Sequence, residues 1–157
     1  EYQQSGDKGS ESARRILAKI AVLCSFIKRR KHLALSNYKD YRIPAEELRS
    51  AFRESMQTLE LLDVSHSFYF AETELLGGSE ATALYDFFED VIEEALDSLR
   101  SVNVRISRIG GRRRIAVTLE CEAELSALAR DYPGAEIDND DGEWTCLLTL
   151  GTGGEGR

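Results

Sequence analysis

The sequence predicts an α+β fold, a two-layer sandwich of a mostly antiparallel sheet with helices on one face, preceded by a long helical stalk. Apolar residues recur at helical spacing over residues 12–36, which predicts the stalk. Two pairs of strand-like segments flank glycine-containing turns further along the chain, and helical stretches lie between strands. At 157 residues, the chain is long enough for one domain with its own core.

The first predicted helix carries a wide apolar stripe. Ile16, Ile20, Leu23 and Ile27 follow one another at spacings of three and four residues. This stripe is broader than one small neighbour would cover. We therefore expect a homodimer that forms through residues 13–35.

The two ends of the chain lack apolar periodicity. Residues 1–11 are rich in Gly, Ser and Gln and are predicted to be a disordered lead-in. Residues 151–157, "GTGGEGR", are predicted to be a flexible tail.

Between these ends, residues 41–150 are predicted to form the α+β domain. A second helix begins near Pro44 and ends at Asp63, and a strand follows over residues 64–70. Ser79 is the expected N-cap of a third helix that ends near Arg100. Two hairpins, with a short helix between them, turn at Gly110–Gly111 and Asp141–Gly142.

Composition excludes several classes of function. The net charge is −8, with +4 over residues 1–62 and −12 over residues 63–157, so nucleic acid is not an expected partner. The basic run at residues 28–31 is interpreted as one solvated turn. No signal peptide and no apolar run of membrane-spanning length is found in the sequence. We therefore expect a cytoplasmic segment without membrane contact. A membrane anchor upstream in the parent protein is compatible with this expectation. Three cysteines without metal-ligand spacing are interpreted as reduced, buried thiols.

One acid of the third helix is singled out as a candidate site residue. Five of the acidic residues are assigned to its solvated face, namely Asp86, Glu89, Asp90, Glu93 and Asp97. Glu94 lies on the stripe that continues from Val91 to Ser98 at the border of the predicted core. An acid at such a border must be paired or functional.

From Pro44 onward, the element order resembles the ATP-binding domain of sensor histidine kinases, the Bergerat-type ATPase fold. The segment "IEEALDSLRSVNVRI" resembles the N-box helix of that family, and "ELSALARDYPGAEIDNDDGEWTCLLTL" resembles its last helix and hairpin. The long helix "ARRILAKIAVLCSFIKRRKHLAL" resembles the second dimerisation helix. The resemblance covers about residues 13–150. It divides the chain into a dimerisation-type helix (12–40) and an ATPase-like domain (41–150).

The resemblance implies roles for two residues. Glu94 aligns with the acid that positions or activates the attacking group, and Ser98 aligns with the Asn that helps to hold Mg²⁺. Both are interpreted as vestigial N-box positions for cofactor binding. The serine side chain lacks the carbonyl that coordinates Mg²⁺ well, and Glu94 alone cannot make a nucleotide site. The strand before "EAELSAL" lacks the D-x-G-x-G box of the family, and neither the ATP lid nor a glycine-rich phosphate cradle can be identified.

No other motif supplies a catalytic centre. Neither His32 nor His66 lies in the H-D or H-E motif of the family's phosphoacceptor, which would lie upstream of this chain. Asp138, Asp140 and Asp141 do not meet the twelve-residue pattern of a calcium loop and are interpreted as a solvated hairpin turn. No confident catalytic residue and no metal site follow from the sequence.

The sequence leaves three functions open. The first is a signalling module of a two-component system, with a degenerate ATP-binding site, weak or no nucleotide binding, and a response regulator or another signalling protein as partner. The second is an active histidine kinase region that binds ATP and Mg²⁺ in an unconventional pocket around Glu94. The third is a plain module for dimerisation or partner binding. Without the nucleotide motifs, no cofactor is expected, and the sequence does not decide whether the chain is an enzyme.

Overall fold

The computed structural model describes residues 2–36 and 42–151, with side chains for residues 9–31 and 42–151. The elements in order are α1 (Tyr2–Ser36), β1 (Arg42–Pro44), α2 (Ala45–Thr58), β2 (Ser65–Phe70), β3 (Leu75–Gly77), α3 (Gly78–Ala95), β4 (Ser101–Ile109), β5 (Arg112–Glu120), α4 (Leu128–Asp131), β6 (Glu136–Asp140) and β7 (Glu143–Thr149). Two 3₁₀ turns, Leu59–Leu62 and Leu96–Ser98, extend α2 and α3. The predicted α+β class is confirmed.

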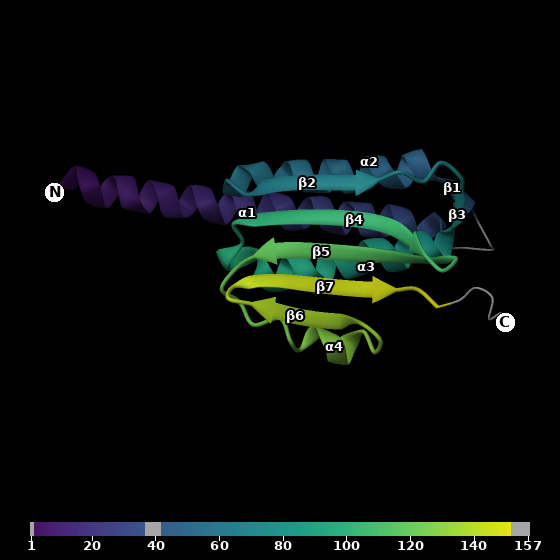
Figure 1. The fold of residues 1–157 in the computed structure, drawn as a ribbon. Helices are drawn as coiled ribbons and strands as arrows, with labels where there is room; N and C mark the ends of the chain where they lie inside the picture. Colours follow the sequence, from purple (N-terminus) through teal and green to yellow (C-terminus); the bar gives the residue numbers. More distant parts are fainter. Residues whose placement is uncertain (1, 37–41, 152–157) are drawn as a thin grey trace.

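Five strands form one sheet in the order β2-β4-β5-β7-β6 (Figure 1). β2 and β4 are parallel, and the other neighbours are antiparallel. Both predicted hairpin turns are confirmed. Gly110 and Gly111 have φ of 60° and 83°, and Asp141 and Gly142 have φ of 55° and 90°. Positive φ at both central residues is the geometry that matches the twist of the flanking strands.

Two short strands were not predicted. β1 and β3 pair in a small antiparallel sheet, in which Ile43 lies opposite Leu76 and both side chains are fully buried. Each strand has three residues, which is too short to show an alternating pattern. β3 runs directly into α3, so Gly77 takes the N-cap position, and the prediction that Ser79 caps this helix is wrong.

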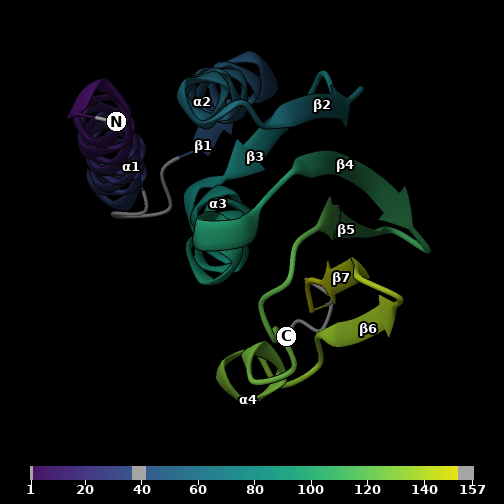
Figure 2. The same cartoon turned by 90° about the vertical axis from the view of Figure 1, so that its left-hand side faces the viewer.

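The elements lie in three layers. Figure 2 shows α2 and α3 against one face of the sheet, and α1 on the far side of these two helices. Phe26 of α1 joins the aromatic core, because its ring lies 5.6 Å from that of Phe88, which is 5.1 Å from the ring of Phe52. Among residues 2–36 and 42–151, no helix covers the other face of the sheet (Figure 2). Helices therefore cover one face of the sheet, as predicted.

α1 begins at Tyr2, so the helix includes residues 2–11, for which the sequence predicted a disordered lead-in. Extending an existing helix costs much less free energy than starting one, which allows a polar segment to continue it. The N-terminal part of α1 extends past the sheet, whereas its C-terminal part lies beside α2 and α3 (Figure 1). The predicted tail, from residue 152 onward, lies outside the described residues. Among described helices, none combines the length and the hydropathy needed to cross a membrane.

Candidate functional site

The structure separates the two residues that the N-box resemblance selects. Glu94 is exposed at the end of α3, so the expectation that its side chain borders the core is wrong. Ser98 ends the 3₁₀ turn that follows α3, and its Oγ accepts a hydrogen bond of 2.8 Å from the backbone N–H of Glu122. The two side chains therefore do not form a buried pair.

The hydrogen bond to Ser98 fixes the chain where it leaves β5. β5 ends at Glu120, and α4 begins at Leu128. Residues 121–127 make this short connection, in the place where the family resemblance would put the adenine-binding box and the lid. The hydroxyl of Ser98 therefore stabilises the backbone at the start of this connection.

A cavity of about 390 Å³ lies beside this connection and the turn between β6 and β7. Its charged lining residues are Arg100, Glu122, Glu124 and Asp141. Arg100 is 3.5 Å from Glu122, so two further carboxylates have no cation among the lining residues. This charge balance repels a triphosphate. Among the residues that the structure describes, no group of three or more His, Cys, Asp or Glu side chains is placed to hold a metal ion.

The buried acid of α3 is Glu89. Its side chain is 1% exposed and contacts Nε of Arg30, which reaches it from α1. The sequence assigned Glu89 to the solvated face, because a two-layer sandwich leaves that side of the helix open. The packing of α1 turns this side of α3 into an interface.

Arg30 binds two more carboxylates of α3. Its Nε is 3.1 Å from Oδ1 of Asp86, and its Nη2 is 3.0 Å from Oδ1 of Asp90. Tyr132, which follows α4, donates a hydrogen bond to Oδ2 of Asp90. One arginine of α1 therefore gathers three acids of α3, which we call the Arg30 cluster: Arg30, Asp86, Glu89 and Asp90.

Electrostatics in the Arg30 cluster favour proton uptake. Burial raises the pKa of Glu89 to about 7, although Arg30 opposes the shift, and the nearby carboxylates of Glu93, Asp90 and Asp86 reinforce it. Burial also raises the pKa of Asp86, again against Arg30. The single positive charge of Arg30 does not neutralise the three carboxylates of the cluster. A proton on Glu89 therefore lowers both the cost of burying its charge and its repulsion from the neighbouring carboxylates.

Over residues 9–31, α1 has two apolar faces, and the described part of the chain packs against one of them. Val22 and Phe26 are fully buried against the domain. On the opposite side, Leu17, Ile20 and Ile27 are 66%, 50% and 57% exposed. Cys24 is also exposed on this side, so the expectation that all three cysteines are buried is wrong for Cys24, whereas Cys121 and Cys146 are buried.

His66 is half-buried on β2, and its Nε2 lies 2.9 Å from Oε2 of Glu60. This contact gives it a structural role. His32 lies outside the residues whose side chains are described. Asp138, Asp140 and Asp141 are exposed on the β6–β7 hairpin, as the sequence predicted.

No protein-family model matches the chain, and no curated protein matches it. The fold is similar to that of a bacterial phosphotransferase, with a TM-score of 0.55 and 11% identity over 88% of this chain and 78% of that one. The histidine kinase domain of a blue-light-activated kinase from Erythrobacter litoralis has a TM-score of 0.55 and 16% identity, over 88% of this chain and 84% of that one.

A third similar structure is the histidine kinase ThkA in complex with the response regulator TrrA. Its TM-score is 0.52 at 12% identity, over 90% of this chain and 51% of that one. These levels of identity show the fold alone. The chain has the α+β fold of the histidine kinase ATPase-like region, as the resemblance implied.

Proposed function

We propose that this chain, which has the fold of a histidine kinase ATPase-like region, is a signalling module that acts through the packing of α1 rather than through nucleotide chemistry. The observation that supports the proposal most is that α1 has one packed face and one exposed apolar face. One face is docked on α3 through Phe26 and the Arg30 cluster, and the opposite face exposes Leu17, Ile20 and Ile27. A partner that binds the outer face of such a helix could shift the helix, and the domain packed on its inner face would move with it.

The outer face of α1 is the surface that we propose for homodimerisation. A stripe of large apolar side chains along one helix is typical of a self-complementary interface between two copies. A response regulator is the partner class that we propose for the assembled module. Support for this comes from ThkA, which has the same fold and was solved with a response regulator.

Nucleotide binding is the activity that we propose to be absent. The hydroxyl of Ser98 accepts the backbone N–H of Glu122, Glu94 is exposed, and the adjacent cavity has an excess of carboxylates. Losing a hydrogen bond from a site built for it costs on the order of 1–3 kcal/mol, and losing metal and phosphate contacts adds to that. Together, these losses of binding free energy raise the dissociation constant for Mg-ATP above about 1 mM.

Isothermal titration with Mg-ATP and Mg-ADP at millimolar concentration tests this proposal. We expect no saturable heat for either nucleotide. Saturable binding at micromolar concentration that Ser98→Ala or Glu94→Ala abolishes would favour the active kinase instead. Glu136→Ala, at an exposed acid of β6, is the matched control for the loss of one negative surface charge.

A further inference from the structure

The end of the molecule that holds the β4–β5 turn carries a cavity that the proposed function does not use. Figure 1 places the end of β2, β3 and this turn together at that end. The cavity measures about 350 Å³. Its lining includes Tyr69, Phe70, Ile106 and Arg108, together with the segment 71–74 that joins β2 to β3.

The cavity begins where β2 leaves the sheet. The last pair between β2 and β4 is Phe70 with Ile106, whereas β4 continues to Ile109 and stays paired with β5. Residues 107–109 therefore form a short strand edge that β2 no longer covers. A free edge of this kind offers backbone donors and acceptors to an added strand.

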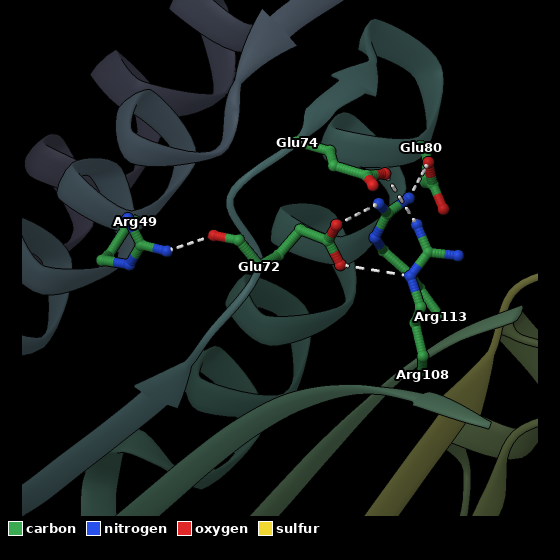
Figure 3. A network of polar contacts seen from close by, with 6 residues as sticks. All are labelled: Arg49, Glu72, Glu74, Glu80, Arg108 and Arg113. Atoms are coloured by element: carbon green, nitrogen blue, oxygen red, sulfur yellow. Dashed lines mark hydrogen bonds and ion pairs between the residues drawn. The ribbon is translucent and has the colours of Figure 1, made fainter. Parts of the chain in front are cut away.

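Ion pairs between two arginines and two glutamates stabilise the inner wall of the cavity. Arg108 and Arg113 lie directly opposite each other on β4 and β5, and Glu72 bridges them at 3.2 Å and 3.3 Å. Glu80 also binds Arg113, whose side chain is 7% exposed. Figure 3 shows Glu72 reaching from the β2–β3 segment to both arginines. Burial acts to raise the pKa of Glu72, but the two arginines outweigh it and hold that pKa below its usual value.

The outer rim, which we define as Arg105, Arg112, Ile109 and Leu75 beside the cavity, is basic and apolar. The exposed acid that lines the cavity itself, Glu74, lies 3.5 Å from Arg108. Arg105 and Arg112 are exposed on the uncovered face of the sheet, and among the described residues neither has a carboxylate partner. Arg105 instead lies over the ring of Tyr69, at 4.7 Å. Ile109 and Leu75, which neighbour lining residues in the chain, are also exposed. Although the net charge of the protein is −8, the positive charges of this rim attract acidic groups of a ligand locally.

We propose that an extended segment of a partner protein, with acidic and apolar side chains in alternation, pairs with the β4 edge at residues 107–109. Successive side chains of a strand point to opposite faces. Apolar side chains of the segment would enter the cavity beside Phe70 and Ile106, while its acidic side chains would meet Arg105 and Arg112 on the outer face. Backbone pairing supplies affinity, and the alternation supplies specificity.

The probe is a fluorescein-labelled peptide with the core Glu-Leu-Glu-Leu-Glu, and fluorescence anisotropy with the intact chain is the measurement. We expect saturable binding below millimolar concentration. The Arg105→Gln, Arg112→Gln double variant should weaken it by about tenfold. Ala71→Phe, which fills the cavity from an exposed position, should weaken it to a similar extent. Arg130→Gln is the matched control and should change nothing.

Two control peptides separate strand pairing from charge attraction. The reordered core Leu-Leu-Glu-Glu-Glu has the same composition without the alternation. The core with an N-methylated central Glu keeps the side chains and the charge but lacks the central backbone N–H. Both should bind at least tenfold more weakly than the probe. The proposal is overturned if the probe does not bind, if the reordered peptide binds equally well, or if Arg130→Gln weakens binding as much as the double variant does.

Discussion

Arg30 of α1 forms an ion pair with Glu89 of α3, a carboxylate that is 1% exposed. The same guanidinium binds Asp86 and Asp90, so it holds α1 against α3 at a buried carboxylate. A second ion pair, between Lys19 of α1 and the exposed Asp97 of the 3₁₀ turn after α3, also joins these elements. Breaking a buried pair by removing one partner is costly, because the remaining charge stays desolvated. The position of α1 therefore depends on the protonation of this cluster as well as on Phe26.

Stability should fall as pH rises through the pKa of Glu89. That pKa is about 7 in the folded chain and 4.5 without the fold, so the folded state holds its proton more tightly. The stabilisation is complete below about pH 4.5 and is lost as pH rises through 7. Between about pH 5 and pH 8, the unfolding free energy should drop by about 2–3 kcal/mol.

Urea unfolding of the wild-type chain and of Glu89→Gln at these two pH values checks this prediction. The neutral glutamine should remove most of the slope and raise stability at the higher pH. Glu94→Gln, which changes an exposed acid of the same helix, should keep the wild-type slope. A slope that survives in Glu89→Gln would assign the pH dependence to another group.

Arg30→Met should destabilise the chain by about 3–5 kcal/mol at pH 8, because Glu89 loses its cation inside the interface. The cost should be smaller at pH 5, where Glu89 is protonated. Hydrogen exchange of α1 is the direct measurement and should show faster exchange along the helix. Lys28→Met, an exposed change on the same helix, should stay within about 0.5 kcal/mol of wild type. Equal exchange in the two variants would contradict the role of Arg30.

Ser98→Ala should cost about 0.5–1.5 kcal/mol of stability, because the backbone N–H of Glu122 loses its acceptor. Glu94→Gln should cost less than about 0.5 kcal/mol, since Glu94 is exposed. Thermal unfolding of the two variants gives the comparison. A larger loss for Glu94→Gln than for Ser98→Ala would reverse these assignments.

Ile20→Asp should convert a dimer into a monomer. The substitution puts a charge at the centre of the exposed stripe of α1, without touching the face that carries Val22 and Phe26. Light scattering of wild type and variant at tens of micromolar protein reports the mass. Leu61→Asp, at an apolar residue of α2's 3₁₀ extension that is also exposed, should leave the mass unchanged. A monomeric wild-type chain would contradict the proposed interface.

The sequence by itself determined the type and order of most elements. Helical and strand periodicities are local, and the paired glycine-containing turns require positive φ that few other residues adopt. The amphipathic pattern thus located α2, α3 and both hairpins within a few residues. It could not locate β1 and β3, because three-residue strands carry no measurable period.

Only the tertiary structure decided which acid of α3 is buried and which face of α1 is packed. In a two-layer sandwich, α3 would bury one side, and Glu89 would face water. α1 covers a second side of α3, which widens the buried arc to include Glu89 and leaves Glu94 outside it. α1 has apolar residues on both sides, so its hydrophobic pattern fits either orientation. The choice comes from Phe26, whose ring contacts those of Tyr85 and Phe88, and from Arg30, which binds the acids of α3. These contacts join residues far apart in the chain, and no local period encodes them.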